Sequence, residues 1–223
     1  MRGRADGCCA CADAGQVPAY EHPAGREHVR ARRVAQAGVI AAVYAVLTFL
    51  VIQFGSVFSF GFIQFRLSEA LTVVACLTPA ALPGLFVGSA LANLSSVATF
   101  GAVGLLDVAF GSLATLLGAA WTWRFRRRTP LALAGPVIFN ALIVPAYLPL
   151  MLGAGGFTTI PVLGITLSSA WPVLYLTGVV GVGLGQAVVV YGLGWPLLAA
   201  LRRMRLPGLS EDAAAGAPRD VAP

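Results

Sequence analysis

Long apolar stretches alternate along this chain with short polar or basic segments, which is the pattern of a protein that crosses a membrane several times. The first stretch, residues 34–54, contains no charged residue. An apolar helix of about 20 residues is long enough to span the ~30 Å hydrocarbon core of a bilayer. Further stretches of the same character lie at residues 67–94, 103–123, 131–152 and 168–201. The pattern therefore predicts an all-α fold, an integral membrane bundle.

The number of crossings depends on residues 67–94, which Pro79 and Pro83 interrupt. Arginines gather on the cytoplasmic side of membrane proteins. If the chain turns at residues 78–83 and crosses twice, both downstream arginine clusters lie on the same side as the N-terminal arginines. In that arrangement all of the 15 arginines except Arg66 are cytoplasmic.

We therefore predict six transmembrane helices in a bacterial plasma membrane, with both termini cytoplasmic. Helices two and three are then short, roughly 12–15 residues each, which is tolerable where protein or a cavity rather than lipid faces their ends. Residues 1–33 are predicted to be a disordered cytoplasmic tail. Residues 34–201 form the six-helix transmembrane domain, and residues 202–223 form a basic and polar cytoplasmic tail.

The amino-acid composition argues against several classes of function. Hydrophobic residues make up 58% of the chain and charged residues 11%, against roughly 25% charged residues in an average soluble domain. This argues against a soluble enzyme and against a nucleic-acid-binding protein. The net charge of +6 comes from arginines at the ends of the predicted helices. The sequence has no G-x-x-x-x-G-K-[ST] loop, so any energy for active transport comes from elsewhere.

Cysteine and histidine are concentrated in the N-terminal tail. Cys76 lies in an apolar stretch, whereas the tail contains Cys8, Cys9, Cys11, His22 and His28. Thiolate and imidazole are zinc ligands, but this spacing matches no common zinc finger, and we predict neither a metal site nor a cofactor. The apolar part contains no histidine, which excludes a Ser–His catalytic pair within the membrane.

Three charged residues lie within or beside the apolar stretches: Arg66, Glu69 and Asp107. A charge at mid-bilayer costs at least about 2.5–3.5 kcal/mol, and such residues usually face the interior of a bundle. Arg66 and Glu69 are three residues apart, so they can contact each other on one helix face. The alternatives are a salt bridge at the outer interface for this pair, and for Asp107 a carboxylate favoured by the helix dipole near a helix start.

Amide side chains accompany these charges. Each one alone is explained by the hydrogen bonds that hold membrane helices together. In the six-helix topology, however, the three charges and the amides Gln64 and Asn93 share the outer half of the bundle. Two more amides, Asn140 and Gln186, lie in later predicted helices. The candidate substrate-binding residues are therefore Gln64, Arg66, Glu69, Asn93, Asp107 and Asn140.

The first predicted helix carries a stripe of small residues, Ala37, Ala41 and Ala45, at intervals of four. Small residues at this spacing allow another helix to approach closely. That helix can belong to the same bundle or to a second membrane protein, and the pattern alone leaves both open.

Residues 60–72, Phe-Gly-Phe-Ile-Gln-Phe-Arg-Leu-Ser-Glu-Ala-Leu-Thr, resemble a signature of the QueT family. Its members are substrate-binding S components of energy-coupling factor (ECF) transporters, assigned to queuosine precursors. A second long motif, Gly-Leu-Leu-Asp-Val-Ala-Phe-Gly-Ser-Leu-Ala-Thr, lies at residues 104–115. Shorter motifs lie at residues 82–85, 92–94, 140–144 and 185–194. The resemblance covers roughly residues 34–201. One position departs from it, because similar sequences tend to have Glu where this chain has Gln186.

The resemblance implies six helices, a pocket that faces the outside, and a complex with a transmembrane T component and two ATPase subunits. It also implies that the stripe of Ala37, Ala41 and Ala45 meets the T component. Such a division of labour agrees with the lack of a nucleotide-binding motif in this chain.

A queuosine precursor is a 7-deazaguanine, for example 7-aminomethyl-7-deazaguanine, which bears a cationic aminomethyl group. Its ring N–H and exocyclic amine form a donor pair that suits a carboxylate, and its carbonyl suits Arg, Gln or Asn. Glu69 or Asp107 can accept from the donors or balance the cation, and the other candidates can donate to the carbonyl. For stacking on the ring, the aromatic candidates are Phe65, Tyr147 and Trp171.

Other functions remain open at this stage. The strongest is a proton-coupled secondary transporter of a small polar or nucleobase-like solute, in which Glu69 or Asp107 titrates. Such carriers often contain inverted repeats, and no convincing repeat is visible here. A membrane enzyme would need a nucleophile–base pair or metal cluster, which the sequence does not show. A structural adaptor would not need charges deep in the bundle.

Overall fold

A computed structural model of the protein describes residues 23–54, 64–159, 166 and 170–204. Within these residues every regular element is helical, which confirms the predicted all-α fold. The label η marks 3₁₀- and π-helical segments. The elements are α1 (Pro23–Phe54), η1 (Leu67–Cys76), α3 (Ala81–Phe100), η2 (Gly101–Gly104), η3 (Asp107–Gly111), α4 (Ser112–Arg124), α5 (Thr129–Ala154), α6 (Trp171–Ala187), η4 (Val188–Gly194) and α7 (Trp195–Met204).

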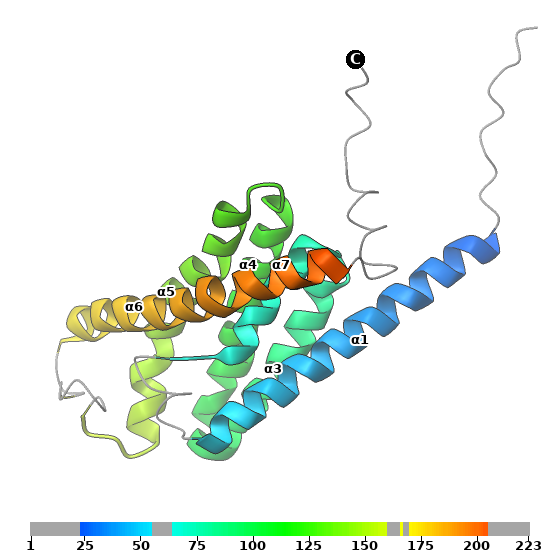
Figure 1. Ribbon diagram of the computed structural model, residues 1–223. Coiled ribbons are helices and arrows are strands. Elements are labelled where there is room, and N and C mark those ends of the chain that lie inside the picture. Colours follow the sequence, from blue (N-terminus) through cyan, green and yellow to red (C-terminus); the bar gives the residue numbers. More distant parts are fainter. Residues whose placement is uncertain (1–22, 55–63, 160–165, 167–169, 205–223) are drawn as a thin grey trace, which may run out of the picture.

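Four helical stretches are long and apolar enough to cross a membrane: Glu27–Gln53, Ala81–Gly104, Thr129–Ala154 and Trp171–Met204. In Figure 1, α6, η4 and α7 form one long helical rod, and α1 forms a second. Apolar side chains stay exposed on these helices; Val34 is 72% exposed and Leu176 is 63% exposed. An exposed apolar surface of this extent is expected where lipid covers the protein. The count of six crossings and the cytoplasmic position of both termini remain predictions.

The predicted break in the second apolar stretch is present, because η1 ends at Cys76 and α3 begins at Ala81. The element before the break is a 3₁₀ helix of 10 residues. At about 2.0 Å rise per residue it is too short to cross a bilayer alone. The prediction that the following helix is also short was wrong, since α3 has 20 residues. Pro83 lies in its first turn, where proline is tolerated, and α3 ends before Gly101, whose φ is 63°.

Helix α1 begins at Pro23, so residues 23–33 are helical and do not belong to a disordered tail as predicted. Proline is favoured in the first turn of a helix, and Ala, Arg and Glu, which are common in the next ten residues, are good helix formers. The cysteines of the N-terminal tail and His22 lie outside the described residues. Among the described residues no group of three or more His, Cys, Asp or Glu side chains is placed to hold a metal ion.

The described basic segments meet at one end of the bundle. The N-terminal end of α1, the connection between α4 and α5, and the end of α7 lie toward the same end in Figure 1. Arg202 on α7 is 3.4 Å from the Thr129 hydroxyl at the start of α5. Leu201 on α7 and Ile40 on α1 pack against the same apolar cluster. This arrangement fits the orientation that the arginine distribution predicted.

The core has apolar clusters at both ends and polar residues between them. Three buried amide side chains each lie, along their helix, between a residue of the apolar cluster at one end and a residue of an apolar cluster at the other end. Asn93 lies between Leu85 and Phe100 on α3, and Asn140 lies between Leu133 and Val144 on α5. Gln186 lies in the same way between Val182 and Val190. We call this middle level the polar layer.

Helices α4 and α5 pack closely because a glycine on each helix faces a larger residue on the other: Gly118 faces Pro136, and Gly135 faces the Trp121 ring. A Cβ atom on Gly118 would lie 2.9 Å from the Pro136 Cα. Pro136 lies inside α5 and cannot donate a backbone hydrogen bond to Ala132. The Thr122 hydroxyl of α4 donates to the Ala132 carbonyl at 2.9 Å instead. Such compensation is what allows proline inside a membrane helix.

Candidate functional site

The polar layer contains a buried ion pair between Arg66, just before η1, and Asp107, at the start of η3. Arg66 Nη2 donates to both carboxylate oxygens of Asp107 at 3.1 Å. Arg66 Nη1 donates to Asn93 Oδ1 at 3.2 Å. The Asn93 amide in turn donates to the Asp107 backbone carbonyl at 2.9 Å. Three predicted site residues from three elements are therefore joined in one network.

Two hydroxyl groups complete the partners of the Asp107 carboxylate. Tyr147 of α5 donates to Oδ1 at 2.7 Å, and Ser96 of α3 donates to Oδ2 at 2.6 Å. Each carboxylate oxygen therefore accepts two hydrogen bonds, which is its ordinary capacity. Gly111 makes this network possible, because a Cβ atom there would lie 2.7 Å from Asp107 Oδ1 and 2.8 Å from Asn93 Nδ2.

Arg66 forms its ion pair with Asp107 and not with Glu69, the neighbour that its spacing in the sequence suggested. Arg66 precedes η1 with extended backbone, φ −79° and ψ 93°, and its side chain reaches Asp107 on η3. The link from Arg66 to Glu69 is a backbone hydrogen bond of 2.9 Å. Asp107 does lie in the first turn of its helix, as the helix-dipole alternative requires, but it is also 1% exposed and paired with Arg66.

Glu69 differs from Asp107 because only one of its oxygens has partners. Glu69 Oε1 accepts from the Tyr44 hydroxyl of α1 at 2.5 Å and from the Thr115 hydroxyl of α4 at 2.9 Å. Its other oxygen, Oε2, is buried and has no hydrogen-bond partner. An unpaired buried polar group is costly, so this oxygen is available for a ligand.

The remaining unpartnered buried polar atoms of the polar layer belong to three amides. They are Gln64 Oε1, Asn140 Oδ1, and both Nε2 and Oε1 of Gln186. All three side chains are at most 1% exposed. Asn140 does use its amide nitrogen, which donates to the Pro136 carbonyl at 2.9 Å. Gln186 was not among the residues that the sequence singled out for binding.

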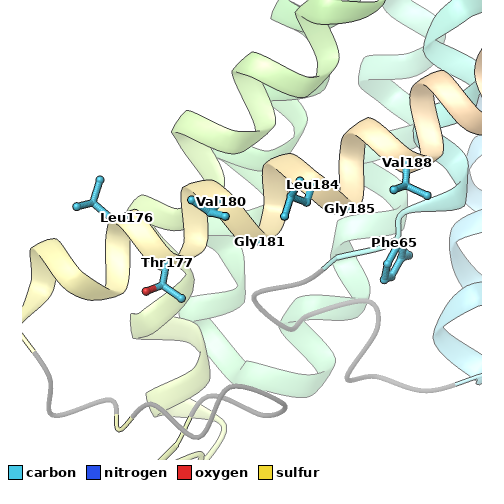
Figure 2. A pocket seen from close by; sticks show the side chains of 8 residues that line it. All are labelled: Phe65, Leu176, Thr177, Val180, Gly181, Leu184, Gly185 and Val188. Atoms are coloured by element: carbon cyan, nitrogen blue, oxygen red, sulfur yellow. The ribbon is translucent and has the colours of Figure 1, made fainter.

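An apolar groove of about 510 Å³ runs along α6 beside this layer (Figure 2). Its lining includes Phe65, Gly181 and Gly185, and its one hydroxyl-bearing residue is Thr177. Phe65 and Gly185 are the chain neighbours of Gln64 and Gln186. Among the predicted stacking residues, Phe65 thus lies at the groove. Tyr147 is held by Asp107, and Trp171 stacks on Tyr175 with ring centroids 5.0 Å apart.

The stripe of small residues on α1 packs inside the bundle. Ala41 is 6% exposed and Ala45 is 9% exposed. A Cβ atom on Gly88 of α3 would lie 2.9 Å from the Ala41 Cα, and one on Gly84 would lie 2.7 Å from the Ala37 carbonyl oxygen. The structure therefore favours packing against α3 over an open partner surface for these three alanines. The neighbouring Gly38 faces open space.

Several residues of the network were not predictable from the sequence, above all Tyr44, Thr115 and Ser96. Single hydroxyl groups in apolar helices are too common to stand out. One signal was available: Ser89, Asn93 and Ser96 recur at helical spacing on α3, which marks a polar stripe on one face. Tyr44 had no such signal, because its role depends on α1 lying beside η1.

These features describe a helical membrane protein whose bundle interior contains charged and hydrogen-bonding side chains. No curated protein and no solved structure shows significant similarity to the chain. The sequence model of the QueT transporter family matches residues 34–203. The chain therefore belongs to the QueT transporter family, as its motifs suggested.

Proposed function

We propose that this protein is the substrate-binding S component of an ECF transporter and that it imports a queuosine precursor of the 7-deazaguanine type. Membership of the QueT family supports transport. The observation that carries the substrate class is the buried Glu69 carboxylate, which has one oxygen fixed and the other without a partner. A carboxylate held in this way can accept from the donor pair of a guanine-like ring or balance one positive charge.

The proposed partners are a transmembrane T component and two ATPase subunits. The chain itself has no P-loop, so a separate subunit would have to bind and hydrolyse ATP. The alanine stripe of α1 is occupied by α3, which leaves the exposed face of α1, including Gly38, for a partner helix.

The test is binding and uptake measured separately. Purified protein in detergent should bind 7-aminomethyl-7-deazaguanine without ATP, and uptake in cells should require the ATPase subunits. Lack of binding by well-folded protein would exclude the proposed substrate class. Uptake that survives deletion of the ATPase genes but stops with a protonophore would instead support a proton-coupled carrier.

A further inference from the structure

Building on the proposed function, we infer that Gln64, Glu69, Asn140 and Gln186 form the surface that recognises the substrate, and that Gln186 determines how strongly a cationic substrate is preferred. Arg66 and Asp107 are positioning residues that hold this surface in place. The inference rests on which polar atoms have partners and on how the four residues are brought together.

A chain of contacts brings these four residues to one level of the bundle. The Asn140 side chain of α5 lies near the Glu69 carboxylate but is not hydrogen-bonded to its Oε2. The next residue, Ala141, approaches α6 so closely that a Cβ atom on Gly183 would lie 3.4 Å from its side chain. Two residues further along α6, the Gln64 backbone fills the space that a side chain at Gly185 would need. Gln64 and Glu69 then belong to the same short segment, so the contacts form a closed ring.

The unpartnered atoms of this ring match the edge of a planar heterocycle. Glu69 Oε2, Gln64 Oε1 and Asn140 Oδ1 are acceptors, whereas Gln186 has a free donor and a free acceptor. A guanine-like ring presents adjacent N–H donors and a carbonyl acceptor on one side. A ligand of this kind can therefore satisfy buried groups that the protein leaves without partners. Both carboxylate oxygens of Asp107, in contrast, already have two hydrogen-bond donors each.

The charges of the polar layer support a role for Gln186 in selectivity. Arg66 and Asp107 neutralise each other, which leaves Glu69 as the one other charged side chain in the described part of the polar layer. Gln186 is neutral and 0% exposed. It immediately precedes Ala187 and the π-helical segment η4, and such segments often occur at functional sites. A second carboxylate at this position would add a charge–charge attraction that only a cationic ligand gains.

The experiment compares two ligands with the same ring, cationic 7-aminomethyl-7-deazaguanine and neutral 7-cyano-7-deazaguanine, by calorimetry on purified full-length protein. Gln186→Glu should increase the preference for the cationic ligand by about tenfold or more, since close buried charge pairs contribute well over 1 kcal/mol. The matched control is Gln36→Glu. Gln36 also has an unpartnered, buried Oε1, but it lies on α1 outside the ring of contacts, so the preference should not change.

If Gln186→Glu does not fold, a second pair of variants, with leucine at the same two positions, tests the inference. Gln186→Leu should weaken both ligands by about tenfold, the net value of one hydrogen bond to the ligand, whereas Gln36→Leu should bind like the parent. Equal behaviour of the position-186 and position-36 variants would overturn the inference while the parent still binds. If the folded parent binds neither ligand, the proposed function itself is wrong and the inference falls with it.

Discussion

At the residue scale, the two buried carboxylates of this protein have opposite hydrogen-bonding situations. Both oxygens of Asp107 are filled by Arg66, Tyr147 and Ser96, whereas Glu69 keeps one oxygen without a partner. Asp107, with all its hydrogen-bond partners inside the protein, links three parts of the bundle. Glu69 has an oxygen that a ligand can use. Substitution of each carboxylate by its amide should therefore have different consequences.

Asp107→Asn should lower the stability of the protein by about 3–5 kcal/mol, because it leaves the Arg66 guanidinium as an uncompensated buried charge. The measurement is the midpoint of thermal or denaturant unfolding in detergent. Arg66→Met combined with Asp107→Leu removes both charges and should recover much of the loss. If the single variant is as stable as the parent, the ion pair does not support the bundle.

Glu69→Gln should leave stability close to that of the parent but weaken ligand binding by about tenfold or more. The Gln side chain keeps the Oε1 acceptor for Tyr44 and Thr115, and its amide replaces an oxygen that has no partner. Calorimetry with 7-aminomethyl-7-deazaguanine measures the affinity, and an unfolding curve of the same sample serves as the control. Unchanged affinity in a folded variant would remove Glu69 from the site.

At the element scale, the contact between α1 and α3 depends on small residues on both helices. Ala41 and Ala37 of α1 face Gly88 and Gly84 of α3, and the space for additional side-chain atoms is absent there. Tyr44 lies next along the same face of α1 and reaches Glu69. Close packing of these two helices therefore also positions a ligand-binding group.

Ala41→Trp should force α1 away from α3 and reduce both the stability of the protein and its ligand affinity. Gly38→Trp is the matched control, because a Cβ atom at Gly38 has no neighbour within 4 Å. That variant should fold and bind like the parent, and if the exposed face of α1 meets the T component it should fail to co-purify with it. Normal folding of Ala41→Trp would contradict the observed packing.

At the scale of the whole molecule, the arrangement of the basic ends predicts the orientation in the membrane. In a background whose native cysteines are replaced, Arg127→Cys should react with a membrane-impermeant maleimide only after the cells are permeabilised. Gly153→Cys, at the other end of α5, should react in intact cells, since a side chain there meets open space. The reverse labelling pattern would invert the topology.

Local patterns in the chain were enough to predict the helices, the break before α3 and the buried charges. Hydropathy placed the long helices, the prolines placed the break before α3, and the high cost of charge in an apolar stretch marked Arg66, Glu69 and Asp107 as interior residues. The family motifs were also readable from the chain alone, and the family was confirmed over residues 34–203. Each of these signals depends on residues that are near each other in the sequence.

Which residues contact one another became known only from the packing of the helices. Arg66 pairs with Asp107, 41 positions away, rather than with Glu69 three positions away. The alanine stripe faces α3, and Tyr44 contacts Glu69 although no local pattern marked it. Gln186 was visible in the sequence as an amide in an apolar stretch, but only the packing places it in the polar layer. Spacing along one helix defines a face, but the partner of that face depends on how the helices are arranged. The physical reason is that a buried polar group takes whichever complementary group the packing of other helices brings within hydrogen-bonding distance.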